Sequence, residues 1–244
     1  MGNHTQTGFT VIEVMLFLAV TGMLAVGILV GSGVTIGQQR YRDSVNSVKS
    51  YIQQQYNAVT NTINGRSKGW SCDSAGNVSE AFSGQARGTS DCVVLGRIII
   101  VDPAGTKLTS SNVIGYRTPG APAGSSDIDE IKLYRLTSSP IEPEIEEVPW
   151  GAQIVKPKTT IPQPFSVLIV RSPLSGSILT FTAEGVQPNL NNLVNITNVS
   201  NVGNLCLNAD IGTFVGKRME VRIDSGATSQ SAVHVPPESE SVCD

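Results

Sequence analysis

Apolar residues fill the N-terminal part of the chain. From Val14 to Gln39 there are 26 positions without a formally charged side chain, and Arg40 and Arg42 end this run. A helix of about 20 apolar residues spans a lipid bilayer. The run is therefore long enough to form a transmembrane helix.

The pattern then changes to an amphipathic one without losing its helical spacing. Apolar or aromatic residues continue in steps of three and four, which predicts one buried helical stripe. The stripe consists of Tyr41, Val45, Val48, Ile52, Tyr56, Val59 and Ile63. We expect one helix from Phe9 to Asn64, about 84 Å long, with a membrane half (9–39), an amphipathic half (40–65) and a stop at Gly65. Two helices separated in the glycine-rich stretch 27–37 are the alternative.

Beyond this helix, short runs rich in β-branched residues alternate with turn residues, which is typical of β-strands. The pattern predicts an α+β fold, in which the long helix packs on an antiparallel β-sheet head over residues 66–244. The expected strands are Val93–Val101, Asn112–Arg117, Ile131–Thr137, Ala152–Val155, Phe165–Arg171, Ser177–Ala183, Leu205–Asn208 and Arg218–Asp224.

Turn and loop residues divide these strands. The segments 102–106 ("DPAGT") and 172–176 ("SPLSG") predict hairpin turns. Six prolines fall within 138–164, which predicts a loop-rich insertion without a central strand. We expect the tail from Ser225 to be poorly ordered except where Cys243 ties it down.

The charge of the chain is close to neutral, at −3, but it is unevenly distributed. Residues 40–117 hold nine Lys and Arg against five Asp and Glu, whereas residues 127–147 hold seven acids against two basic residues. Two solvated faces are the simplest interpretation. A weak surface for polyanions or cations is the alternative.

Four cysteines, Cys72, Cys92, Cys206 and Cys243, lie beyond the apolar run. An even number of widely spaced cysteines indicates two disulfides in an oxidising compartment. Three pairing schemes are possible, and we favour the one that is local in sequence, Cys72–Cys92 together with Cys206–Cys243. A metal site is not expected, because the chain has no C-x-x-C motif and only two histidines.

No motif for catalysis or for a cofactor is present, so we expect a protein that is not an enzyme. The chain has no G-x-S-x-G turn and no glycine-rich phosphate loop. Asp127, Asp129 and Glu130 could ligate Ca²⁺, but their spacing favours a solvated turn. Trp70 is expected to cover a disulfide, and Trp150 to be either an exposed contact or a buried anchor of its loop.

The start of the apolar run carries a carboxylate, which is costly in hydrocarbon and usually marks a function. The stretch reads "GFTVIE" from Gly8 to Glu13. A cleaved secretory signal, with small residues at Ala25 and Gly27, and a plain signal anchor are two interpretations that leave Glu13 unexplained. The order of Gly, Phe-Thr, an acid five residues after the Gly, and an apolar helix resembles the class III leader of type IV prepilins.

This resemblance implies how the chain is processed and assembled. In that family a prepilin peptidase removes the leader, here residues 1–8, by cutting between Gly8 and Phe9, and it then methylates the amine of Phe9. The Glu13 carboxylate would pair with the amine of a neighbouring subunit. The leader lacks the basic residues that such leaders usually carry. The implied partners are other pilin subunits, an assembly ATPase and a membrane platform protein, and the implied location is a single-pass position in the cytoplasmic membrane with an extracytoplasmic head.

The arrangement also resembles that of H-type minor pseudopilins, whose heads contain two β-sheets. In this resemblance the segments 92–101 and 217–226 would be core strands of the two sheets. The length of the chain favours a minor subunit of a type IV pilus or of a type II secretion-like filament. Two other classes stay open: a tip module that binds DNA or a surface through the basic residues Arg66, Lys68, Arg87 and Arg97, and a plain membrane-anchored β domain or enzyme.

Overall fold

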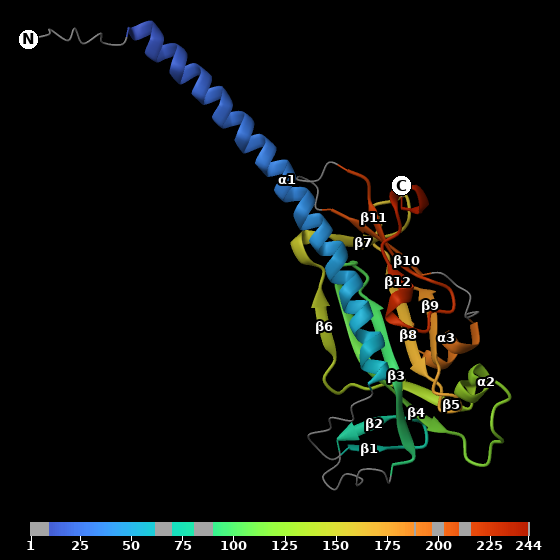
Figure 1. Ribbon diagram of the computed structural model, residues 1–244. Helices are drawn as coiled ribbons and strands as arrows, with labels where there is room; N and C mark the ends of the chain where they lie inside the picture. Colours follow the sequence, from blue (N-terminus) through green and yellow to red (C-terminus); the bar gives the residue numbers. More distant parts are fainter. Residues whose placement is uncertain are drawn as a thin grey trace, which may run out of the picture.

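The computed structural model describes residues 10–61, 70–80, 90–187, 189–196, 203–209 and 216–243. A single long helix, α1 (Val11–Thr60), extends well beyond a β-rich head (Figure 1). All strand pairs of the head within the described residues are antiparallel. The predicted α+β class is therefore confirmed.

Helix α1 is continuous over 50 residues, or about 75 Å, so the glycines between 27 and 37 do not divide it. It begins after Thr10, whose hydroxyl accepts a hydrogen bond from the Glu13 N–H at 3.3 Å. It ends at Thr60, with Asn61 as its C-cap, earlier than the predicted Asn64. Threonine and asparagine are poor residues for a helix interior, which explains the earlier end. The predicted stop at Gly65 lies outside the described residues.

The larger sheet has six strands in the order β5-β4-β3-β8-β9, with β6 also paired to β4. Strand β4 is long enough for β5 to pair with its C-terminal half and β6 with its N-terminal half. The strands are β3 (Cys92–Val101), β4 (Lys107–Arg117), β5 (Tyr134–Ser138), β6 (Glu144–Glu147), β8 (Phe165–Arg171) and β9 (Ile178–Glu184). The predicted turns 102–106 and 172–176 join β3 to β4 and β8 to β9.

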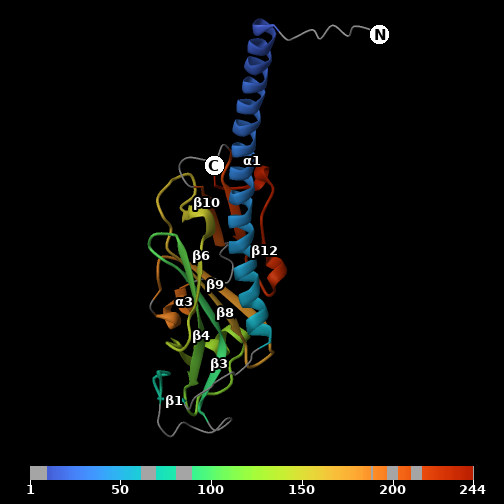
Figure 2. The same cartoon turned by 90° about the vertical axis from the view of Figure 1, so that its left-hand side faces the viewer.

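A four-stranded sheet has the order β12-β11-β10-β7, and a separate two-stranded ribbon pairs β1 with β2. Helix α3 (Figure 2) and the turn η1 lie in the chain between strands of the six-stranded and the four-stranded sheet. The remaining elements are β1 (Trp70–Cys72), β2 (Val78–Glu80), β7 (Gln153–Val155), β10 (Gly203–Asn208), β11 (Met219–Ile223), β12 (Val233–His234), α2 (Asp127–Lys132), α3 (Leu190–Ile196), η1 (Pro149–Gly151), η2 (Gln230–Ala232) and η3 (Glu238–Glu240).

Two hydrophobic cores lie on opposite faces of the six-stranded sheet. Alternating residues of β3 and β8 face opposite sides, as the twofold periodicity of a strand requires. On one side they pack with the stripe of α1 and with β10 and β11. On the other side they pack with Ile131 of α2 and with Leu190, Leu193 and Val194 of α3. Every described member of the predicted stripe is buried, which confirms this part of the prediction.

Two strand predictions need correction. The expected strand Ile131–Thr137 is the end of helix α2 followed by β5. Ser126 caps this helix, and the acids in its first turn stabilise the helix by interacting with the positive end of its dipole. The expected strand Asn112–Arg117 begins earlier, at Lys107, because its polar first half pairs with β3 and β6.

The prediction of a poorly ordered tail after Ser225 is wrong. This segment forms η2 and β12, and Ala227 and Val233 are buried. The Gln53 side chain of α1 donates hydrogen bonds to the carbonyl oxygens of Gln230 and Val233. Hydrogen bonds to side chains of α1 thus hold a segment whose composition alone indicates disorder.

Candidate functional site

The N-terminal half of α1 is apolar and stands clear of the head. From residue 11 to residue 29 every side chain is exposed except the half-buried Thr21. The most apolar window of α1 has a mean hydropathy of 2.5 and none of it is buried. Within the described residues this is the one helix long and apolar enough to cross a membrane. Such a surface needs lipid or other apolar helices around it.

Glu13 occupies the third position of α1. Together with Thr10 it forms the T-x-x-E sequence of a capping box, and the Thr10 hydroxyl accepts the Glu13 N–H. The positive end of the helix dipole stabilises a carboxylate in this first turn. The capping position is a structural role for Glu13 that the sequence interpretation missed, although its T-x-x-E signal was readable. Gly8 and Phe9, the predicted cleavage and methylation positions, lie outside the described residues.

The point where α1 meets the head is marked by a tryptophan and an arginine. The Arg40 guanidinium lies 4.9 Å from the centre of the Trp150 ring. The Ser44 hydroxyl, one turn further along α1, donates a hydrogen bond to the Pro149 carbonyl at 2.8 Å. Trp150 is 56% exposed, so of its two expected roles the exposed contact describes it better. The Trp70 side chain is not described, and its predicted cover of a disulfide stays a prediction.

Buried tyrosines connect the second half of α1 to the four-stranded and the six-stranded sheet by hydrogen bonds. The Tyr41 hydroxyl donates a hydrogen bond to the Leu207 carbonyl at 2.7 Å and accepts one from the Met219 N–H at 2.6 Å. The Tyr56 hydroxyl lies 2.9 Å from that of Thr180. Burial raises the pKa of Tyr56 to about 12. The tyrosines were predicted as part of an apolar stripe, but their hydroxyl partners were not.

The basic and acidic segments of the sequence lie against each other in the fold. Three ion pairs join them: Arg97 to Glu144 at 2.8 Å, Lys107 to Glu147 at 3.1 Å and Arg117 to Glu130 at 2.9 Å. Strand β6 carries two of these acids along the N-terminal half of β4. The uneven charge along the chain is thus partly neutralised in space. Arg66, Lys68 and Arg87, named for DNA binding, lie outside the described residues.

Arg97 also ties α1 to the sheet. Its Nη1 donates to the Gln55 side-chain oxygen at 2.7 Å, and the Ser110 hydroxyl donates to the same oxygen at 3.1 Å. Gln55 and Ser110 are fully buried. A buried polar group is costly without partners, so these contacts make Arg97 a structural residue.

Two of the three carboxylates considered for Ca²⁺, Glu130 and Asp129, stabilise their own segment, and the third, Asp127, accepts a hydrogen bond from the Ser172 hydroxyl. Glu130 accepts hydrogen bonds from Arg117 and from the Gly124 N–H, and these contacts lower the pKa of Glu130. Asp129 accepts hydrogen bonds from Ser125 and Ser126, which lower its pKa. Within the described residues no cluster of three or more metal-ligating side chains is found.

The cysteines form the two sequence-local pairs. Cys72–Cys92 ties the β1–β2 ribbon to the start of β3, and both cysteines are half-buried. Cys206–Cys243 is fully buried and ties the end of the chain to β10.

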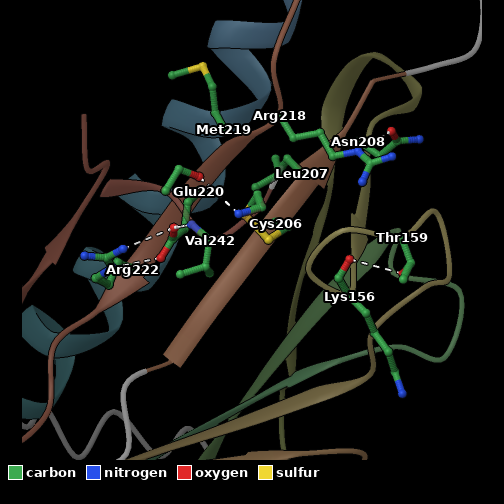
Figure 3. The surroundings of a disulfide bond; sticks show 12 residues. Lys156, Thr159, Cys206, Leu207, Asn208, Arg218, Met219, Glu220, Arg222 and Val242 are labelled. Atoms are coloured by element: carbon green, nitrogen blue, oxygen red, sulfur yellow. Dashed lines mark hydrogen bonds and ion pairs between the residues drawn. A yellow bond between two sulfur atoms is a disulfide. The ribbon is translucent and has the colours of Figure 1, made fainter. Parts of the chain in front are cut away.

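Glu220 reinforces the second disulfide. This residue faces Cys206 across the β10–β11 pair and is buried (Figure 3). Its carboxylate accepts hydrogen bonds from the Arg222 side chain at 2.8 Å and from the Val242 N–H at 2.9 Å. The Arg222 side chain also donates to the Glu240 carbonyl at 2.6 Å. In the sequence, Glu220 lies between the apolar residues Met219 and Val221, a pattern that predicts an exposed position for the acid in a strand.

The described residues therefore offer one distinctive feature, the exposed apolar half of α1. It has Glu13 in its first turn, and it ends where Arg40 contacts Trp150 of the β-rich head. Comparisons of this chain with protein-family models, with curated proteins and with solved structures gave no match.

Proposed function

We propose that this chain is a structural subunit of a type IV pilus or type II secretion-like filament, made as a prepilin. In this proposal the precursor is cut between Gly8 and Phe9, methylated on Phe9, and polymerised through α1. The observation that carries the proposal is the contrast between the two halves of α1. One continuous helix has an exposed apolar half that begins with Glu13 and a second half buried in the head.

Glu13 gives the proposal its mechanism. Cleavage after Gly8 creates an ammonium group on Phe9, close to the first turn of α1. When apolar helices pack side by side with an axial offset, the Glu13 carboxylate of one subunit can meet the amine of the next. Each group neutralises a charge that would be costly alone in an apolar environment, and the pair fixes the register between subunits.

The finer assignment, an H-type minor pseudopilin, rests on the head. The segment 92–101 is the central strand β3 of the larger sheet, and the segment 217–226 contains β11, an inner strand of the second sheet. Prepilin peptidase, an assembly ATPase and a membrane platform protein are the proposed partners. The proposed location is the cytoplasmic membrane, with the head outside the cytoplasm, where disulfides form.

The proposal is tested by intact mass and N-terminal sequencing of membrane-extracted protein from cells with and without prepilin peptidase. We expect a peptidase-dependent chain that begins with N-methyl-Phe9. A chain that keeps Gly8 in both strains would leave a plain signal anchor, and a start near Ala25–Gly27 would indicate a cleaved secretory signal. Either result overturns the proposal.

A DNA-binding tip module is not proposed. Its support was the basic excess of residues 40–117, and Arg97, Lys107 and Arg117 each pair with an acid. Phosphate binding at these three residues would have to break those pairs, which reduces the electrostatic gain that the three residues could provide.

A further inference from the structure

One face of α1 connects the apolar half to the head. Ile36, Arg40 and Ser44 follow each other at intervals of four residues and therefore share a face of the helix. Ile36 is 46% exposed and is the last exposed large apolar residue of the run. Arg40 contacts the Trp150 ring, and Ser44 bonds to Pro149. The η1 turn thus lies on this face within about two helical turns of Ile36.

Trp150 lies in a strained turn and is more than half exposed. Its φ of 60° and ψ of 27° place it in the left-handed region, which costs a residue other than glycine about 1 kcal/mol or more. Gly151, the next residue, also has a positive φ. The chain therefore maintains a strained turn that leaves 56% of a large aromatic residue exposed, beside the end of an apolar helix.

This combination matches the chemistry of a membrane–water interface. Tryptophan is enriched at the level of lipid headgroups, because its ring is apolar and its N–H is polar. Arginine beside it can place its guanidinium among phosphates while its stem stays on apolar surface. Ile36, which belongs to the apolar run, lies only about 6 Å along the axis from Arg40.

We propose that Trp150 and Arg40 form an anchor in the interfacial region of the bilayer, where they contact phospholipid headgroups and the adjoining acyl carbons. This anchor would set the depth at which the head stands on the membrane before the subunit enters a filament. The proposal rests on the membrane insertion of α1, which is part of the proposed function. It assigns to the head a lipid contact in addition to the contacts of the helix.

The chain contains two tryptophans, which allows a matched fluorescence test. Strand β1, which begins with Trp70, lies at the end of the head farthest from the exposed half of α1 in both views (Figures 1 and 2). The full chain is reconstituted into phosphatidylcholine–phosphatidylglycerol vesicles as two variants, W70F and W150F, each with one tryptophan. Quenching is measured with lipids that carry a nitroxide in the headgroup, at a shallow acyl carbon or at a deep acyl carbon. Resistance of the protein to extraction by alkaline carbonate reports insertion of α1 separately.

In the W70F variant we expect the headgroup and shallow nitroxides to remove about half of the Trp150 emission and the deep nitroxide much less. In the W150F variant we expect little quenching from any position. If the protein is inserted but both variants are quenched equally, the anchor proposal is wrong while membrane insertion stands. If the protein is extracted by carbonate, membrane insertion itself fails and the anchor proposal fails with it.

Discussion

The Tyr41 hydroxyl joins helix α1 to the carbonyl of Leu207, at 2.7 Å, only two residues after the uncharged apolar run ends at Gln39. The same hydroxyl accepts the N–H of Met219, so one side chain links α1 to both β10 and β11. This contact fixes the head to the helix close to where the helix would leave the membrane.

We expect Tyr41→Phe to lower the free energy of unfolding by about 1–3 kcal/mol, because the buried Leu207 carbonyl and the partly buried Met219 N–H lose their partner. Urea unfolding of the full chain in detergent, followed by near-ultraviolet circular dichroism, measures the change. Tyr51→Phe is the matched control, since the partly buried Tyr51 hydroxyl makes a longer bond of 3.2 Å to the Glu144 carbonyl. Equal losses in both variants would contradict the special role of Tyr41.

Glu13 has a capping position and a proposed assembly role, and two substitutions separate them. Glu13→Gln keeps a residue suited to the capping box but removes the charge. Thr10→Ala keeps the charge but removes the cap, which costs about 1 kcal/mol of helix stability. We expect Glu13→Gln to abolish filament formation and Thr10→Ala to leave it largely intact.

Electron microscopy and a shearing assay measure surface filaments, and immunoblotting of membranes confirms that both variants are made and processed. If Thr10→Ala loses filaments and Glu13→Gln keeps them, the cap matters for assembly and the charge does not, so the role of Glu13 is helix capping. Normal filaments in Glu13→Gln would remove the charge pair from the mechanism.

The helix could be predicted from the sequence because its signals are local. The uncharged run and the stripe from Tyr41 to Val59 specify both halves of α1 through their spacing alone. Strand β8 (Phe165–Arg171) was predicted with its observed bounds, since six of its seven residues are buried and residues 167–170 form an uninterrupted apolar run. Buried strands flanked by turns are the easiest strands to recognise.

The parts that were missed depend on contacts between distant segments. Strand β6 is rich in glutamate, a residue disfavoured in strands, and it pairs with β4 where Arg97 and Lys107 balance its charge. The tail around Gln230 is polar and becomes structured because α1 supplies its partners. Neither relationship is visible in a local window of sequence.

The candidate functional site could be predicted in part. Glu13 was identified because a carboxylate is unexpected beside an apolar run, whereas the Trp150–Arg40 contact joins positions that are 110 residues apart. Only the fold brings these two together.

The ion pair of Glu130 with Arg117 predicts a contribution to acid sensitivity. Hydrogen bonds from Arg117 and from the Gly124 N–H lower the pKa of Glu130 below its ordinary value of 4.5. A lowered pKa stabilises the folded state above the ordinary pKa, and this stabilisation is lost as the pH falls through the lowered value. We expect Glu130→Gln to destabilise the protein by about 1–2 kcal/mol at pH 7 and to flatten the fall in stability below about pH 4.5.

Thermal unfolding between pH 7 and pH 3 measures both effects. Glu147→Gln is the control, because its pair with Lys107 is largely exposed and is expected to contribute less than about 1 kcal/mol. If Glu130→Gln follows the same pH profile as the unchanged protein, this ion pair is not a source of the acid sensitivity.

The two disulfides are expected to differ in their resistance to reduction. A reducing thiolate must reach a sulfur atom, so access controls the rate. Cys72 and Cys92 are half-buried, whereas Cys206 and Cys243 are fully buried beneath a segment that the Glu220 carboxylate holds through the Val242 N–H. Mild reduction of the folded protein should therefore open Cys72–Cys92 first. Differential alkylation followed by peptide mass spectrometry measures the order.

Glu220→Gln provides the informative variant, because it weakens the charge-assisted bonds to Arg222 and Val242 while leaving both disulfides in place. We expect it to accelerate reduction of Cys206–Cys243 and to leave the rate at Cys72–Cys92 unchanged. If both rates rise together, the variant has destabilised the whole head, and the contacts of Glu220 do not act locally on the C-terminal segment. If neither rate changes, burial of the two cysteines beside Val155 protects Cys206–Cys243 without help from Glu220.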